Sequence, residues 1–218
     1  MAAPVEYQSF CPVGASLNVV GERWALLIVR DLLLGPRRYS ELLNGLGGIG
    51  TDILAARLRT LTEHGVLRQI GAGRSRGYEL TDEGQALRPV LEALGRWGAP
   101  RLRLPEDPAQ IPLRVPLTSL LLGATALPRR ANGVFEVGVE DEHVRVEVAG
   151  GEVRAAPDRE PDATLRLTWS GLRSLILGER VADADVVVTG DARKAHALLD
   201  GLTGPPLLAG LRDQLGAG

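Results

Sequence analysis

The chain has 218 residues, a hydrophobic content of 44%, a formal net charge of −2 and one cysteine. This length is enough for one large domain or for two small domains with separate cores. No apolar run approaches the ~20 residues that span a bilayer, and the N-terminus lacks the charged and apolar regions of a secretion signal. We therefore expect a protein of the reducing cytoplasm that has no membrane partner.

Charge is distributed unevenly along the chain. Residues 1–104 carry a net charge of +3, and residues 105–218 carry a net charge of −5. This asymmetry favours a polyanionic partner for the first half only. Several prolines between residues 101 and 116 indicate a linker. We predict a first domain at 1–104, a linker at 105–116 and a second domain at 117–218.

Three short helices are predicted before residue 50. Their apolar spacing places them at Val13–Val20, Glu22–Leu34 and Tyr39–Leu46, and Ser40 or its neighbour should cap the third helix. Glycines between residues 45 and 50 then allow the backbone to turn sharply.

A fourth helix, from Thr51 to His64, is the predicted recognition helix. Thr51 is a favourable N-cap, and Gly65 is a favourable C-terminal stop. Leucines at i, i+4 and i+7 should face the core and leave a largely polar face outward. The leucines are Leu54, Leu58 and Leu61, and the outward residues are Thr51, Asp52, Ala55, Ala56, Arg59 and Thr62.

Two strands, Val66–Ile70 and Tyr78–Leu80, are predicted on either side of a tip that bears glycine and arginine. Helix, turn, helix and hairpin in this order are typical of a winged helix-turn-helix, which places one helix in a DNA major groove. Arginines flanked by glycines can contact phosphates or enter a minor groove. We therefore predict double-stranded DNA as the partner. The predicted DNA-binding residues are Arg37, Arg38, Ser40, Thr51, Asp52, Ala55, Arg57, Arg59, Arg74, Ser75 and Arg76, of which Arg57 and Arg59 could instead pair with acids.

A fifth, long helix is predicted after Thr81, which should cap it. Its apolar stripe runs from Leu87 to Trp97 despite the presence of Pro89.

The second half changes from helices to alternating strands. Its order is helix, strand meander, helix, strand and helix, which is typical of an α+β domain with an antiparallel sheet. The predicted elements are Leu117–Leu127, Val134–Val139, His143–Val148, Glu152–Ala155, Ala163–Thr168, Trp169–Leu177, Asp185–Thr189 and Asp191–Leu202.

The motifs of residues 11–98 resemble the HxlR family of bacterial transcriptional regulators. The resemblance is carried by Cys11-Pro12, Trp24, LLLGPRRYSEL, RLRTL and LTDEG. It implies a winged-helix homodimer that binds a near-palindromic operator and dimerises through its first helix and the Leu87–Trp97 helix. The sequence departs from the family at GIGTDI, where the family usually places polar or basic residues. Asp52 in this segment could accept a hydrogen bond from a cytosine amine.

The second half resembles the sterol-carrier-protein-like fold, through a strand that ends at Thr168-Trp169, the LRSLILG helix and the VVVTGD segment. The resemblance implies an apolar tunnel for a hydrophobic small molecule, which would act as an effector. A dry, filled core is the alternative. The predicted ligand-binding residues are Leu121, Phe135, Val137, Val146, Leu167, Trp169, Leu172, Leu175 and Ile176.

Other classes of function are less well supported by the sequence. The three histidines lack metal-ligand spacing, and no phosphate-binding loop or nucleophile elbow is present, so we expect no enzyme activity, metal or cofactor. Cys11 lies where some HxlR-like regulators sense oxidants, and it is a candidate redox residue if its thiol is exposed and its pKa is lowered. A carrier that sequesters a hydrophobic metabolite is a further alternative.

Overall fold

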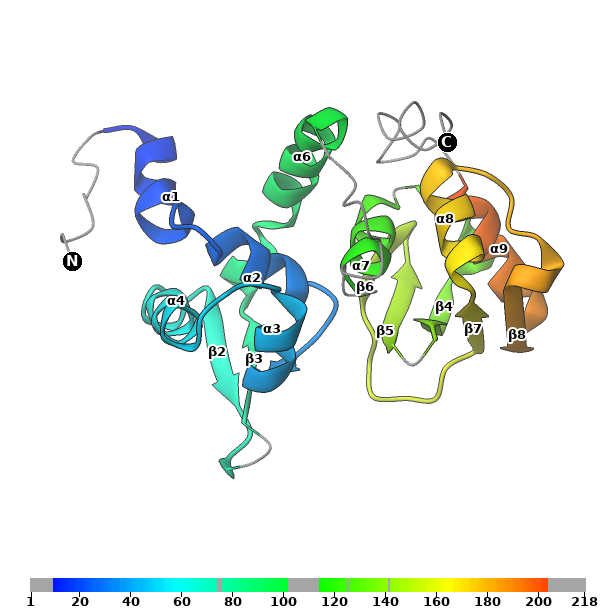
Figure 1. The fold of residues 1–218 in the computed structure, drawn as a ribbon, viewed down its shortest axis with the longest axis horizontal. Helices are drawn as coiled ribbons and strands as arrows, with labels where there is room; N and C mark the ends of the chain where they lie inside the picture. The colour runs from blue at the N-terminus through cyan, green and yellow to red at the C-terminus, as the bar shows by residue number, and fades with distance from the viewer. Residues whose placement is uncertain (1–9, 74–75, 102–113, 125, 141, 204–218) are drawn as a thin grey trace. The chain divides into compact units, whose positions relative to one another are not determined.

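The computed structural model describes residues 10–73, 76–101, 114–124, 126–140 and 142–203 (Figure 1). The chain forms two compact units, residues 1–88 and 89–218. The helices and the small sheet of the first unit follow the predicted order. They are α1 (Pro12–Val20), α2 (Ala25–Leu32), β1 (Arg37–Arg38), α3 (Tyr39–Gly45), α4 (Thr51–Glu63), β2 (Leu67–Ile70), β3 (Gly77–Leu80) and α5 (Asp82–Gln85).

Helix starts in the first unit differ from the predicted positions for local reasons. Helix α2 begins at Ala25 because Trp24 has a left-handed φ of 81° and ends the preceding turn. Helix α4 is capped by Gly50, which has extended backbone, so Thr51 is its first residue and not its cap. Arg38 caps α3, where the Glu41 carboxylate accepts a hydrogen bond from the Arg38 N–H at 2.6 Å.

The wing is a three-stranded sheet in the order β1-β3-β2. Strands β2 and β3 pair in antiparallel register, with Leu67 opposite Leu80 and Ile70 opposite Gly77. The two residues of β1 join the other side of β3. Sequence periodicity does not reveal β1, because two residues are too few to show an alternating pattern.

Thr81 and Gly84 join the wing to the helix that follows it. The Thr81 hydroxyl donates to the Gly65 carbonyl at 2.5 Å and accepts from the Gly84 N–H at 3.2 Å, which confirms Thr81 as a cap. A Cβ atom at Gly84 would lie 2.2 Å from the Val66 carbonyl oxygen. Only glycine fits there, which explains the glycine of the LTDEG motif.

The prediction of a single long helix after Thr81 is wrong. The segment forms two helices, α5 and α6 (Arg88–Gly98), and a short 3-10 helix, η2 (Ala99–Arg101), follows. Pro89 explains the division, because it has no N–H to donate to the Gln85 carbonyl and its ring would clash with that group. The predicted apolar stripe is present on α6, but no residue of this helix is buried.

The second unit contains one mixed sheet and, in addition to α6 at its start, three longer helices. Helix α7 begins at Arg114, inside the predicted linker, and residues 105–113 of that linker lie outside the described residues. The remaining elements are α7 (Arg114–Gly123), η4 (Arg129–Ala131), β4 (Gly133–Val139), β5 (Glu142–Ala149), β6 (Glu152–Ala155), β7 (Ala163–Leu167), α8 (Trp169–Leu177), η5 (Asp183–Asp185), β8 (Val186–Gly190) and α9 (Ala192–Leu202).

The prediction of an antiparallel sheet is wrong at one pair of strands. The strand order is β6-β5-β4-β7-β8, and β4 and β7 run parallel, with Phe135 opposite Ala163. The connection between β6 and β7, residues 156–162, crosses the β4–β5 hairpin, where Arg145 donates to the Arg159 carbonyl. This connection is long enough for the chain to enter β7 in the direction of β4, whereas a tight hairpin would force antiparallel pairing.

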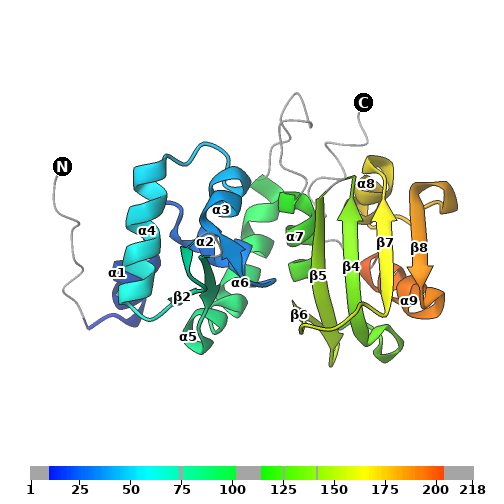
Figure 2. The ribbon, with the colours of Figure 1, turned by 90° about the horizontal axis from the view of Figure 1, so that it is seen from below.

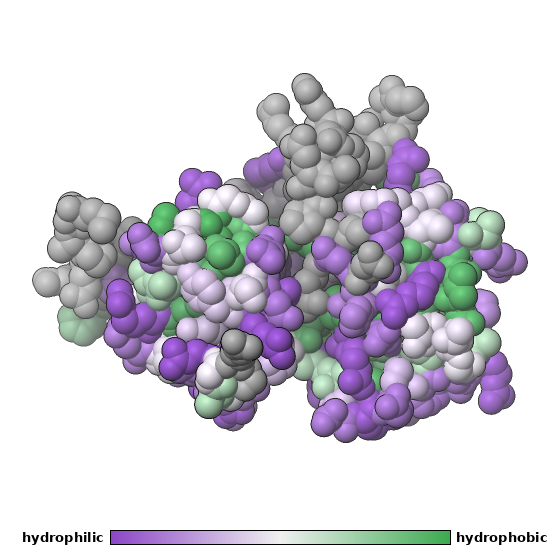
Figure 3. All heavy atoms as spheres, turned by 60° about the horizontal axis from the view of Figure 1, so that its bottom comes forward, coloured by the Kyte–Doolittle hydropathy of each residue, from purple (hydrophilic) through white to green (hydrophobic). Residues whose placement is uncertain are grey.

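The two faces of this sheet differ in character. Buried residues alternate along β5 and β7, and together with Phe135, Val137 and Val139 of β4 they form the core with α7, α8 and α9 (Figure 2). The opposite face carries charged residues such as Glu136 and Arg166, which form an ion pair at 2.6 Å. Figure 3 shows hydrophilic residues across much of that face. On β5 and β7 the alternation of period two therefore separates core from solvent, as the sequence predicts, whereas on β4 Val134 and Gly138 of the opposite face are buried as well.

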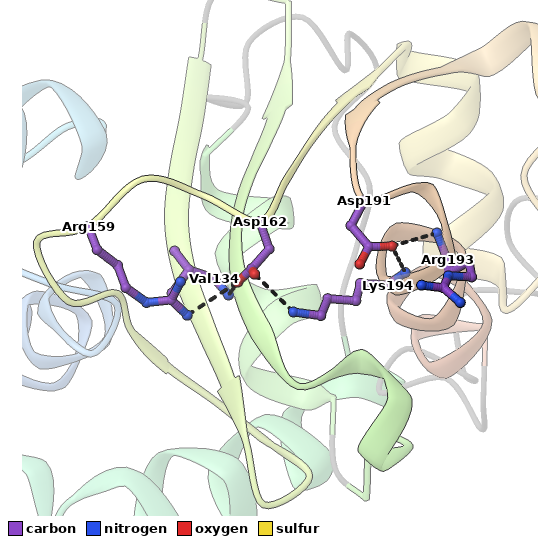
Figure 4. A network of polar contacts seen from close by, with 6 residues as sticks. All are labelled: Val134, Arg159, Asp162, Asp191, Arg193 and Lys194. Atoms are coloured by element: carbon purple, nitrogen blue, oxygen red, sulfur yellow. Dashed lines mark hydrogen bonds and ion pairs between the residues drawn. The ribbon is translucent and has the colours of Figure 1, made fainter.

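Hydrogen bonds of Asp162 connect the segment before β7 to β4 and α9 (Figure 4). Its carboxylate accepts hydrogen bonds from the Lys194 ammonium at 2.9 Å, the Val134 N–H at 2.7 Å and the Arg159 guanidinium at 3.2 Å. The Lys194 hydrogen bond, followed by that from Val134, lowers the pKa of the Asp162 carboxyl from 3.8 to about 2. The charged form of this side chain therefore stabilises the folded second unit.

We expect Asp162→Asn to lower the free energy of unfolding of the second unit at pH 7 by about 1–2 kcal/mol. Because the folded pKa lies below the unfolded value, the contribution is complete above pH 3.8 and is lost as the pH falls toward 2. Urea unfolding followed by circular dichroism should therefore show the two proteins converging in stability as the pH is lowered. Asp158→Asn, an exposed change on the same connection, should leave the urea midpoint unchanged. An Asp162→Asn protein as stable as the wild type at pH 7 would contradict this role.

Candidate nucleic-acid interface

Helix α4 presents one face to the core and another to solvent. Leu54, Leu58 and Leu61 are buried, as predicted. The remaining sides of the helix carry the side chains predicted to reach base edges. Thr51, Asp52, Ala55, Arg59 and Thr62 are exposed, and Ala56 is half-buried.

The start of α4 is held by a residue that the sequence analysis did not single out. The Tyr39 hydroxyl, at the start of α3, donates a hydrogen bond to the Thr51 carbonyl at 2.9 Å. The turn between the two helices is anchored by Leu46 and Ile49, which are both buried. Together these contacts fix the first turn of α4 relative to α3, and a tyrosine that opens a helix before a glycine-rich turn is the only sequence signal of this role.

The two arginines of α4 have different surroundings. Arg57 is half-buried and pairs with the Glu22 carboxylate at 3.1 Å, which is the acid-pairing alternative predicted for it. Arg59 is exposed. Of the two, Arg59 is therefore the one whose guanidinium reaches solvent freely.

The wing carries further cations. Arg76 is exposed, while Arg74 and Ser75 lie outside the described residues. Gly71 and Gly73 have positive φ values of 67° and 56°, so the turn needs the backbone freedom that glycine provides. At the base of the wing, Arg68 pairs with Glu79 at 2.5 Å.

Residues at the start of α3 complete the predicted set. Arg38 and Ser40 are exposed. Arg37 is half-buried, with Nη2 donating to the Glu41 carbonyl at 3.3 Å and Nη1 buried without a hydrogen-bond partner in the described part of the chain. Exposed members of the predicted set thus occur on α3, on α4 and on the wing segments.

The predicted ligand-binding residues gather in the core of the second unit. They come from α7, β4, β5, β7 and α8, and all are buried except Trp169 and Ile176, which are not fully enclosed. Trp169 belongs to α8 and not to the sheet face. A buried polar residue lies in the same core, because Thr118 of α7 is 1% exposed and its hydroxyl has no hydrogen-bond partner among the described residues.

Other candidate sites have little structural support. Cys11 is a free, exposed thiol at the start of α1. The described residues bring no three His, Cys, Asp or Glu side chains together as a metal site. No helix among the described residues combines the length and the apolar character needed to cross a membrane.

Comparison with protein families identifies residues 19–104 as an HxlR-like helix-turn-helix. Rv3095 of Mycobacterium tuberculosis, an uncharacterised HTH-type transcriptional regulator, is 38% identical over 99 residues, which are 44% of this chain and 62% of the relative. YvaP of Bacillus subtilis, another uncharacterised HTH-type transcriptional regulator, is 33% identical over 38% of this chain and 79% of its own length.

The chain thus spans about three fifths of the mycobacterial relative. Among solved structures, quinone-bound YodB of B. subtilis matches 41% of this chain and 97% of its own, with 29% identity and a TM-score of 0.37.

Proposed function

Because the chain belongs to the HxlR-like helix-turn-helix transcriptional regulators, we propose that it binds a near-palindromic operator as a homodimer in the cytoplasm. The exposed face of α4, held at its first turn by Tyr39, is the observation that carries this proposal. Helix α4 would enter the major groove, and the arginines of the wing would contact phosphates. The predicted set of DNA-binding residues is retained in this proposal, except that Arg57 supports the fold through Glu22.

Selection from random DNA duplexes with the full-length chain tests this function. We expect an inverted repeat whose half-site centres lie about one helical turn, ~34 Å, apart. Affinity for the selected duplex should fall with rising salt, because bound phosphates release counterions. A pool that shows no enriched sequence after repeated rounds would contradict operator binding.

Exposed apolar residues support the proposed dimer. On α1, Val13 is 66% exposed, and on α6, Trp97 is 64% exposed. Leu17 of α1 and Leu94 of α6 are also exposed large apolar residues. Apolar stripes left open on two helices are typical of surfaces that a partner covers. These are the helices through which the family resemblance implies dimerisation.

The second unit is proposed to bind a hydrophobic small molecule that shifts DNA affinity. The unpaired Thr118 hydroxyl supports this step, since a buried hydroxyl without a partner favours a polar group brought by a ligand. The sterol-carrier-like interpretation of this unit stays a prediction. Native mass spectrometry of the purified chain, with and without operator DNA, tests the step. Bound ligand that lowers or raises the DNA-bound fraction would support a regulator, whereas ligand binding without any DNA complex would favour a carrier.

A further inference from the structure

An exposed isoleucine stands in the first turn of α4. Ile53 is 47% exposed, although its neighbour Leu54 is fully buried and continues the core positions Leu58 and Leu61. Ile53 does not follow the i, i+4, i+7 spacing of the buried leucines and is not among the predicted DNA-binding residues. The side chain of Ile53 is therefore available to a partner outside the core.

The chemistry of the first two turns of α4 is unusual for contact with DNA. Residues 51–58 contain one cation, Arg57, and it pairs with Glu22 at 3.1 Å. The side chains left to meet base edges offer methyl groups, one hydroxyl and one carboxylate. Guanine presents two acceptors in the major groove and is read best by arginine or lysine. These two turns therefore favour bases that present a methyl group or an amine.

Thymine is the base whose major-groove edge carries a methyl group. Ile53 suits such a contact because its β-branched side chain has one strongly preferred rotamer in a helix, so little side-chain freedom is given up on binding. The hydrogen bond from Tyr39 to the Thr51 carbonyl, 2.9 Å long, holds the backbone of the same turn. Ala56 lies one turn further along the helix, at i+3 from Ile53, and adds a small apolar side chain next to Ile53.

We infer that Ile53 determines part of the operator sequence by packing against the C5 methyl group of a thymine in each half-site. This inference rests on the proposed function of operator binding. It assigns to α4 an apolar contact in addition to the acceptor that Asp52 offers to a base amine. Contacts with the phosphates would then be made by cations outside these two turns, such as Arg59 and Arg76.

Replacement of thymine by uracil removes the methyl group alone and tests the inference directly. Each thymine of the selected operator would be changed in turn, and affinities of wild type, Ile53→Ala and Ile53→Val would be measured by fluorescence anisotropy. For the wild type, one thymine per half-site should be sensitive, with about fourfold weaker binding for one half-site and about sixteenfold for both. Ile53→Ala should be insensitive to uracil at that position, and Ile53→Val should retain most of the sensitivity.

The outcomes separate this inference from the proposed function. Wild-type binding that is insensitive to uracil at every thymine, or an equally large effect of uracil in Ile53→Ala, overturns the role of Ile53 and leaves operator binding intact. Failure of the wild type to select any sequence removes both. If Ile53→Ala does not fold, as judged by circular dichroism, the uracil scan of the wild type and the Ile53→Val comparison still decide the question.

Discussion

Replacing Arg74 and Arg76 with alanine should weaken binding to every DNA duplex by about tenfold or more, whatever its sequence. The two residues flank Ser75 in the predicted wing tip, and Arg76 is exposed. Removing one phosphate-bound cation should reduce the slope of log affinity against log salt by about 0.9, so four arginines in a dimer give about 3.6. Fluorescence anisotropy with the selected operator and with a random duplex, between about 50 and 200 mM salt, measures both quantities.

A matched control separates local contact from overall charge. The double variant Arg180→Ala, Arg193→Ala also removes two positive charges, but from exposed positions of the second unit. This control should leave the salt slope of the operator complex nearly unchanged. Equal slopes for wild type and the wing variant would exclude the wing as a phosphate-binding element.

Val13→Asp should convert the proposed homodimer into a monomer. A carboxylate buried in an apolar interface is stripped of its hydration and finds no partner there, which opposes association strongly. Sedimentation velocity should then report one 23.2 kDa chain. Because two linked half-sites bind far more tightly than one, operator affinity should fall by about a hundredfold or more.

Val187→Asp is the matched control for this change. Val187 of β8 is 64% exposed, nearly the same as Val13, but it lies on a strand outside the proposed dimer helices. This variant should remain a dimer and keep operator affinity. A Val13→Asp protein that sediments as a dimer would contradict α1 as part of the interface.

Much of the first unit follows from its sequence alone. The leucines of α4 repeat with helical spacing, and Thr81 precedes a turn that its hydroxyl caps, so the order of the helices and the core face of α4 are predicted correctly. These signals are local, because hydrogen bonds within a helix and its caps connect residues only a few positions apart. Family motifs across residues 11–98 then connect the local elements to a winged helix-turn-helix.

The second unit was predictable in its elements but not in its topology. Alternation along β5 and β7 identifies the inner face of the sheet correctly, whereas β4 has buried residues on both faces. The parallel pairing of β4 with β7 depends on the path of residues 156–162 and on Asp162, which bonds to Val134 and Lys194 across 28 and 32 positions of the chain. Contacts this distant leave no periodic signal in the sequence.

Local sequence patterns indicate most of the helices and strands, most of their apolar faces, and the resemblance of α4 and the wing to a DNA-binding winged helix-turn-helix. The partners and the exposure of individual side chains become visible only in the folded chain. Folding pairs Arg57 with Glu22, joins Tyr39 to the start of α4, and leaves Ile53 half-exposed. Periodicity in the sequence shows on which face of its own helix or strand a side chain lies. The contacts of that side chain depend on other elements, which come close only when the chain folds.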